Sequence, residues 1–219
     1  MRVYLKLSKN KEVVPFSHQV KLVGALHKWL GHNDLHDYLS LYSLSWLRGG
    51  KGVVSNGLVF PDGADWFISA HDPDCLKKIV NGIMDDPEVA YGMMVVEMTL
   101  CDTPYFDSEK RFLLGSPVFV RRNIGERQRH FTYDEMESDA LLTETLQYKL
   151  QKVGLPPEGA SVRFERENPI AKTKLSIYRD IKNKVNYCPV IVEGSPEQIG
   201  FAWNVGVGNS TGIGFGSLQ

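Results

Sequence analysis

Apolar and polar positions in the first half of the chain recur in an order that predicts both strands and helices. Residues 2–8 alternate as a half-buried strand does, and the apolar residues of 17–31 fall in one arc about 120° wide on a helical wheel. Ser17 is the expected N-cap of this helix, Gly31 its stop, and Asp72 the N-cap of a second helix. Apolar runs bounded by turn residues predict further strands at 41–47, 53–60, 66–70 and 93–100. The predicted order is β-α-β-β-β-α-β, with the three middle strands forming an antiparallel meander.

The second half repeats this plan. A capping box at Thr132–Glu135 predicts a long helix ending near Gly154, and Ser195-Pro196 begins a short helix through Trp203. Strands are predicted at 117–122, 160–166, 173–178, 186–192 and 214–218. Two ferredoxin-like halves, each an antiparallel sheet with two helices, match this order. We therefore expect an α+β fold of two tandem ferredoxin-like (RRM-like) domains, residues 1–104 and 105–219.

Composition supports a globular protein and excludes several classes. The 219 residues are 42% apolar and 23% charged, so the chain can bury a core and is not a disordered protein. No apolar run approaches the ~18 residues needed to span a bilayer, and the first residues alternate instead of forming a signal-peptide core. Three cysteines without C-x-x-C spacing argue against a disulfide framework and a cysteine-built zinc site. We expect a cytoplasmic protein without a membrane contact.

Charge is balanced overall but locally concentrated. The net charge is −1, yet residues 121–130 hold four Arg against one Glu, and residues 171–184 hold five Lys or Arg against one Asp. These basic residues are Arg121, Arg122, Arg127, Arg129, Lys172, Lys174, Arg179, Lys182 and Lys184. Tyr178 and Tyr187 lie among them, and basic side chains with interleaved aromatics suit contact with an RNA backbone and stacking on unpaired bases. The alternative is that each run is a solvated face of a sheet.

A glycine-rich segment lies near the end of the sequence. Five of the eleven residues from 206 to 216 are glycine: Gly206, Gly208, Gly212, Gly214 and Gly216. Such a loop can present backbone N–H groups to phosphate oxygens. It is neither a Walker A loop nor a dinucleotide fingerprint, because no Lys-Ser/Thr and no helix follow. The alternative is a tight turn whose glycines serve packing alone.

The glycine-rich segment, read as G-x-G-x-x-x-G-x-G-F-G after tandem ferredoxin-like halves, resembles the CRISPR repeat-processing endoribonucleases, the Cas-six family of the RAMP superfamily. The strand at 2–8 followed by Pro15-Phe16-Ser17-His18-Gln19 is similar to the start of that family. So are the Leu35-His36-Asp37 step and Gly115-Ser116-Pro117-Val118. The resemblance covers essentially the whole chain.

The resemblance implies a function and a mechanism. Family members cut CRISPR precursor RNA within its repeats without a metal or another cofactor, and they yield crRNA guides. The 2′-hydroxyl beside the scissile phosphate attacks it and leaves a 2′,3′-cyclic phosphate and a 5′-hydroxyl. The expected partner is repeat RNA, and the candidate protein partners are subunits of a CRISPR effector complex and a second copy of the chain. The glycine loop and the second-half basic hairpin are expected to lie against the RNA.

Histidine suits the acid and base of this reaction, because both protonation states are available near neutral pH. Of the six histidines, His27 falls about 100° from the centre of the helix's apolar arc, at the edge of the core. His36 matches the family's usual catalytic histidine. We expect these two to form the acid/base pair, with their roles unassigned. The alternative is that both are structural, His27 being bonded to a backbone carbonyl.

Two features of the sequence bear on this mechanism, the spacing of the histidines and the absence of a lysine. His27, His32 and His36 do not have the H-x-x-x-H spacing of a helical metal site, so we expect no metal. Many family members carry a lysine between the catalytic histidine and the next strand, and residues 37–40 have none. Ser40 and Lys51 are the candidates to contact the phosphate instead. The rival hypothesis is therefore a module that binds repeat RNA, or helps to assemble an effector complex, and cuts it weakly.

Overall fold

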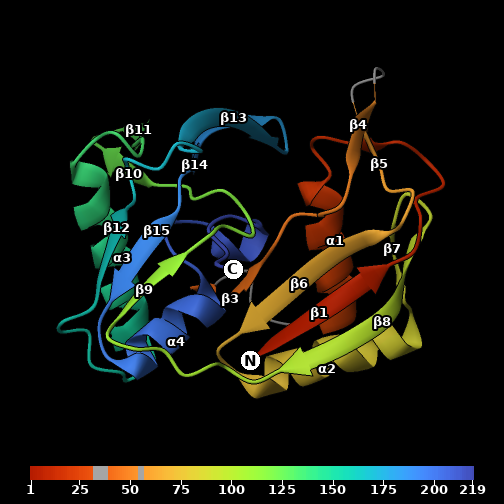
Figure 1. The fold of residues 1–219 in the computed structure, drawn as a ribbon, viewed down its shortest axis with the longest axis horizontal. Coiled ribbons are helices and arrows are strands. Elements are labelled where there is room, and N and C mark those ends of the chain that lie inside the picture. Colours follow the sequence, from red (N-terminus) through yellow and green to blue (C-terminus); the bar gives the residue numbers. More distant parts are fainter. Residues whose placement is uncertain (32–38, 54–56) are drawn as a thin grey trace.

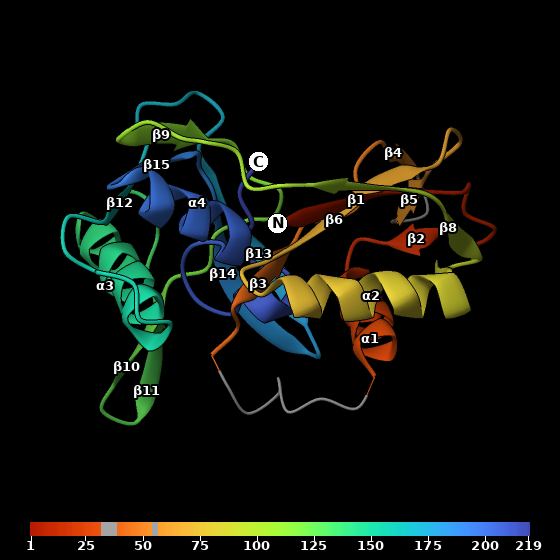
Figure 2. The same cartoon turned by 90° about the horizontal axis from the view of Figure 1, so that it is seen from below.

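Two antiparallel sheets, each with helices on one face, lie side by side in the computed structural model (Figures 1 and 2). The structure describes residues 1–31, 39–53 and 57–219. One cluster of buried apolar side chains comes from the first half of the chain together with Tyr178. A second cluster comes from residues of the second half. The two main cores therefore belong to different halves, as the repeated pattern of elements predicts, and a small third cluster of Phe119, Val185 and Phe215 has Trp46 of the first half packed against it.

The first half has the strand order of a ferredoxin-like fold. Its elements are β1 (Arg2–Leu7), β2 (Val14–Pro15), α1 (Gln19–Leu30), β3 (Tyr42–Leu44), β4 (Lys51–Val53), β5 (Gly57–Val59), β6 (Ala64–Ala70), α2 (Pro73–Asp85), β7 (Glu88–Ala90) and β8 (Met93–Cys101). The main sheet runs β3-β6-β1-β8-β7, and β1 pairs antiparallel with both β6 and β8. Asp72 accepts a hydrogen bond from the Asp74 N–H and caps α2, as expected.

Three local expectations for this half were wrong. α1 begins at Gln19 with His18 at its N-cap, so the exposed Ser17 does not cap it. One strand was expected at 53–60, whereas two strands, β4 and β5, share this range and pair antiparallel with each other. The expected meander does not form, because β3 pairs with β6 and β5 pairs with β2. Two-residue β2 is too short for alternation to reveal it.

The second half repeats the topology with two inserted hairpins. Its elements are β9 (Glu109–Phe112), β10 (Arg121–Ile124), β11 (Arg127–His130), α3 (Glu137–Lys152), β12 (Ser161–Phe164), β13 (Lys172–Tyr178), β14 (Ile181–Tyr187), β15 (Val190–Glu193), α4 (Pro196–Val205) and the 3-10 turn η1 (Thr211–Ile213). The sheet runs β12-β15-β9, and a bridge from Leu114 to Leu218 adds the end of the chain beside β9. Both halves thus show the tandem ferredoxin-like fold that the sequence predicts.

The sheet of this half departs from the sequence prediction at three places. Its first strand is β9, which was not predicted because three of its four residues are polar and exposed. The apolar run after Pro117, where a strand was expected, has only a bridge from Val118 to Asn186. The expected strand at 186–192 is divided between β14 and β15, since Pro189 has no N–H to donate to a ladder. The expected last strand is irregular and bridges only at Leu218.

The start of α3 also lies later than the capping box predicts. The Glu135 carboxylate accepts hydrogen bonds from the N–H and the hydroxyl of Thr132, at 2.8 and 3.0 Å. These contacts form a turn that precedes the helix, which begins at Glu137. By contrast, α4 begins as predicted, with Ser195 and Gln198 forming a reciprocal capping box.

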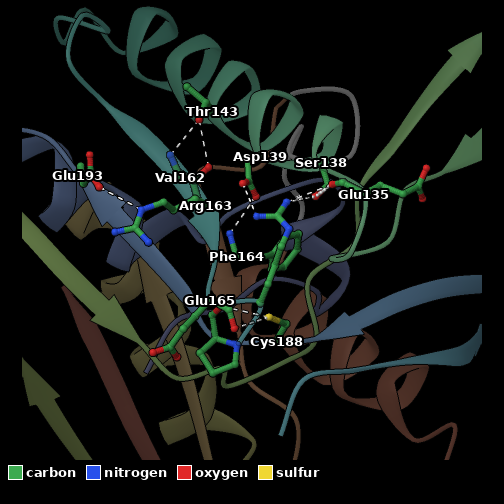
Figure 3. Close-up of polar contacts among 12 residues, drawn as sticks. Glu135, Ser138, Asp139, Thr143, Val162, Arg163, Phe164, Glu165, Cys188 and Glu193 are labelled. Carbon is green, nitrogen blue, oxygen red and sulfur yellow. Dashed lines mark hydrogen bonds and ion pairs between the residues drawn. The ribbon is translucent and has the colours of Figure 1, made fainter. Parts of the chain in front are cut away.

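A network of polar contacts joins α3 to the neighbouring strand β12 (Figure 3). The Asp139 carboxylate accepts a hydrogen bond from the Phe164 N–H at 2.9 Å and pairs with Arg166 at 2.6 Å. Thr143 accepts from the Val162 N–H and donates to its carbonyl. These contacts fix the register of α3 on the sheet, and with it the face of α3 that meets the glycine-rich segment.

Candidate functional site

The predicted catalytic residues fall in different parts of the described chain. His27 lies half-buried in the last turn of α1, and Lys51 is exposed on β4. His36 lies outside the described residues. Ser40 lies two residues before β3 and faces the glycine-rich segment, where a Cβ on Gly212 would collide with its hydroxyl. The structure therefore places Ser40 against the second half, and the acid/base pair stays a prediction.

A tyrosine hydroxyl lies beside Ser40. Its hydroxyl hydrogen-bonds the Tyr42 hydroxyl, and Tyr42 also lies within van der Waals reach of a Cβ placed on Gly212. Burial raises the pKa of Tyr42 to about 12, so this phenol stays protonated at neutral pH. Thr211, the residue before Gly212, is buried as well.

A buried lysine lies behind this segment, and the sequence analysis did not single it out. Lys149, on α3, is 3% exposed and donates to the Val205 carbonyl at 3.2 Å and the Thr211 hydroxyl at 3.0 Å. Burial lowers the pKa of this amine from 10.5 to about 7. A signal was present, because Lys149 falls at helical spacing on the stripe of Leu142 and Leu146.

The glycines of the segment are buried against both halves of the protein. Gly208 and Gly216 have positive φ, and Gly216 has no room for a Cβ because it would meet the Val207 carbonyl. Gly216 N–H donates to Pro117, and its carbonyl accepts from Val207 N–H. These contacts are those of the packing alternative that the sequence left open. Phosphate binding by Gly206, Gly208, Gly212, Gly214 and Gly216 stays a prediction.

The first basic segment forms the hairpin β10–β11, and two of its arginines have carboxylate partners. Arg122 pairs with Glu144 at 2.7 Å, and Arg129 pairs with Glu135 at 2.5 Å. Arg127 is exposed and forms no ion pair with any residue that the structure describes. Arg121 lies over the Phe119 ring, 5.7 Å from its centroid. The hairpin thus carries both structural and uncommitted positive charge.

The second basic segment forms the hairpin β13–β14, next to the first. Its five basic side chains are exposed, and within the described ranges none pairs with a carboxylate: Lys172, Lys174, Arg179, Lys182 and Lys184. The Lys184 N–H donates to His130 Nδ1 of β11 at 3.3 Å, which joins the two hairpins. The His130 ring contacts Phe119 at 4.9 Å, and burial with nearby Arg121 and Lys184 lowers its pKa. We call the two hairpins together the basic face.

Two other kinds of feature are absent from the described residues. No group of three or more His, Cys, Asp and Glu side chains in residues 1–31, 39–53 and 57–219 is arranged to hold a metal ion. No helix in this same part of the chain is long and apolar enough to span a membrane.

Comparisons with known proteins agree on one family. A family model described as "CRISPR associated protein Cas6, C-terminal" matches residues 101–219. The chain is 24% identical along its whole length to a Pyrococcus furiosus protein provisionally named a CRISPR-associated endoribonuclease-like protein Cas6, of which the match covers 98%. The solved structure of a Cas6-related gene from Pyrococcus furiosus is 20% identical, with a TM-score of 0.85 over 100% of this chain and 97% of that one. A second, described as a RAMP protein binding different RNA substrates, is 19% identical, with a TM-score of 0.82 over 100% and 98%.

Proposed function

Because the chain belongs to the Cas6 family of CRISPR-associated proteins, we propose that it is an endoribonuclease that cuts CRISPR precursor RNA within its repeats. The observation that carries the proposal is the basic face, where two hairpins meet at His130 and Lys184 in a chain of net charge −1. Exposed positive charge without carboxylate partners suits a polyanion, whose phosphates it neutralises. Names of two relatives, one endoribonuclease-like and one binding RNA substrates, support the same class.

For the chemical step we propose metal-independent cleavage with His27 and His36 as the acid/base pair. One histidine takes the proton from the 2′-hydroxyl as its oxygen attacks the phosphorus, and the other gives a proton to the leaving 5′-oxygen. The products are a 2′,3′-cyclic phosphate and a 5′-hydroxyl. Support comes from the half-buried position of His27 at the end of α1 and from the suitability of imidazole for both roles.

The phosphate contacts of the proposal come from Ser40, from Lys51 and from the basic face. Ser40 supplies a hydroxyl beside Gly212, and exposed Lys51 on β4 supplies charge. The nine basic residues of the two hairpins bind the RNA backbone, and the glycine-rich segment shapes the surface between the halves.

We further propose two domains, 1–104 and 105–219. The proposed protein partners are effector-complex subunits or a second copy of the chain.

One observation favours the rival function, a module that holds repeat RNA and cuts it weakly. Residues 37–40 contain no lysine, so the stretch between His36 and β3 supplies no positive charge for the pentavalent phosphate. The same basic face serves both functions, and only the cleavage rate separates them.

Cleavage of the host's own repeat RNA in excess EDTA tests the proposal. We expect one cut with a 2′,3′-cyclic phosphate end, and a loss of about 10²-fold or more in single-turnover rate for His27→Ala and for His36→Ala, because each removes a proton-transfer group. Binding of uncut RNA by both variants, measured in the same buffer, should stay within about threefold of the unsubstituted protein.

The matched control is His71→Ala, since His71 is half-buried against Phe201 and has no proposed role. Its cleavage rate should be unchanged. Binding without cutting by the unsubstituted protein would establish the RNA-holding module instead. Cleavage that EDTA abolishes would contradict the metal-independent mechanism.

A further inference from the structure

A groove lies between the start of α1 and the hairpin β13–β14, outside the proposed catalytic residues. Its volume is about 400 Å³. Figure 1 shows β13 extending from the second half toward α1 of the first half, so the groove has one wall from each half. None of the described residues that line it is acidic. We call it the ring groove.

Three rings follow one another along the ring groove. The His18 and Trp46 rings meet edge to face at 6.1 Å, and Trp46 meets Tyr187 in the same way at 6.1 Å. Trp46 is held by a hydrogen bond of 2.7 Å from its indole N–H to the Gly214 carbonyl. Lys174 Nζ lies 5.3 Å from the centroid of the Tyr187 ring. A row of fixed rings beside a cation offers both a stacking surface and a contact for phosphate.

Both walls also carry exposed apolar side chains. Leu175 is 69% exposed and Ile177 is 46% exposed, both on β13, and Phe16 is 58% exposed. Exposed apolar side chains lining a concave surface favour a ligand with a flat apolar face. Lys174 belongs to the same strand as Lys172, so the ring groove continues directly into the basic face.

His18 supplies an unused hydrogen-bond acceptor. The side chain is 3% exposed, and its Nδ1 lies 3.0 Å from the Pro15 carbonyl, which requires the proton to be on Nδ1. Burial lowers the pKa of His18, so the ring is neutral at pH 7 and Nε2 carries a lone pair. Nε2 is buried and has no hydrogen-bond partner in the described part of the chain. A buried polar atom in this state is a rare and costly feature.

We propose that the ring groove binds one unpaired base of the RNA, which stacks among its apolar and aromatic side chains and donates an N–H to His18 Nε2. The inference rests on the proposed function, because the base belongs to the RNA held by the basic face. Every RNA base has a π-face and an N–H donor on its pairing edge, so the ring groove requires an unpaired base and not a particular one. Nε2 is covered in the free protein, so side chains that line the ring groove must move for the base to reach it.

Scanning repeat RNA with single abasic positions tests this inference. In the unsubstituted protein, one position is expected to weaken binding by about tenfold when its base is removed, which is the size of one base-stacking contact. Leu175→Ser removes an exposed wall side chain, and His18→Phe keeps a ring but removes the acceptor. In both variants, loss of the base at that position should weaken binding by less than about threefold further. Ile181→Ser is the matched control, because Ile181 is 62% exposed on the same hairpin and does not line the ring groove.

The outcomes separate the two proposals. Abasic effects that are the same in Leu175→Ser as in the unsubstituted protein, while repeat RNA is still bound and cut, overturn the ring groove and leave the endoribonuclease standing. Equal weak binding of repeat RNA and of an unrelated RNA by the unsubstituted protein overturns the proposed function and the ring groove together. Leu175→Ser changes an exposed side chain, so the test holds even if His18→Phe fails to fold.

Discussion

Lys149 is a single residue whose environment makes the stability of the protein depend on pH. It donates to Val205 and Thr211 from full burial, and no carboxylate among the described residues pairs with it. An amine without a counter-charge in a dry interior favours its neutral form, which is why burial lowers its pKa to about 7. A buried lysine in contact with Thr211 therefore links the charge state of α3 to the glycine-rich segment.

We expect the free energy of unfolding to rise with pH because of Lys149. Below pH 7 the amine is protonated in both states, whereas between about pH 7 and 10.5 only the unfolded chain retains the proton. The unfolded state then binds more protons, so stability rises by up to about 1.4 kcal/mol per pH unit in this window. Denaturant unfolding of the unsubstituted protein and of Lys149→Met from pH 6.5 to 9.5 measures this contribution as the difference between the two curves.

Lys149→Met is the reference for the unsubstituted protein at each pH, since all other titrating groups are common to both proteins. Parallel curves would contradict the lowered pKa of Lys149. If the free energy of unfolding of the unsubstituted protein instead fell with rising pH relative to that of Lys149→Met, the sign would be reversed and would point to a stabilised ammonium.

At the residue scale, sequence patterns predicted the environment of His27 and missed that of Lys149. The amphipathic wheel placed His27 at the edge of the core, and the residue is half-buried. The same pattern applied to α3 puts Lys149 among leucines, but a lone lysine on an apolar stripe is more often a long side chain whose amine reaches water. Its full burial depends on Val205 and Thr211, which lie more than 50 residues further along the chain. Contacts at such separation are outside the reach of local periodicity.

The two hairpins of the basic face are the elements on which RNA affinity should depend. Exposed Arg127 of β11 and Lys182 of β14 belong to different hairpins and form no ion pair in the described ranges. Their replacement by alanine removes charge without breaking a known contact. The expected effect is therefore on phosphate neutralisation alone.

We expect the double variant Arg127→Ala, Lys182→Ala to bind repeat RNA more weakly and with a shallower salt dependence. The slope of log affinity against log salt should fall by about 1.5, since each phosphate contact contributes about 0.7 to 0.9. Affinities measured by fluorescence anisotropy over a range of about 50 to 300 mM salt give the slope. Lys77→Ala, Lys110→Ala is the matched control, with two exposed lysines outside the hairpins. A slope that stays equal to that of the unsubstituted protein would remove the hairpins from the RNA interface.

At the element scale, turn chemistry was informative where it acts locally. The Asp72 cap and the start of α4 at Ser195 were predicted correctly, because both depend on adjacent residues. Strand pairing was not predictable in the same way. The polar strand β9 is part of the sheet only because it pairs with β15, which lies about 80 residues further along the chain. Tertiary pairing overrode a weak local signal there.

For the whole molecule, Arg2 is a buried residue that joins the two halves. It lies on β1 of the first half, is 1% exposed, and donates to the Trp203 carbonyl at 3.1 Å and the Leu218 carbonyl at 2.7 Å. Its guanidinium is sandwiched between the rings of Phe67 and Trp203, 3.9 and 3.6 Å from their centroids. The tandem arrangement was predictable from the repeated order of elements, whereas this interface required the three-dimensional structure, since one arginine near the start of a strand carries no local signal.

We expect Arg2→Met to lower the free energy of unfolding by about 3 kcal/mol, because it leaves two carbonyls without their charged donor in a dry interface. The loss should also separate the unfolding of the two halves, since each has a core of its own. Far-UV circular dichroism and tryptophan fluorescence, followed through the same denaturant titration, would then give transitions that do not coincide. Lys6→Met, an exposed position on the same strand, should leave one shared transition.

A single coincident transition in Arg2→Met would instead mean that the glycine-rich segment and Trp46 hold the halves together without Arg2. The ring groove, whose walls come from both halves, would in that case stay formed in the variant, and RNA binding by Arg2→Met would match that of the unsubstituted protein.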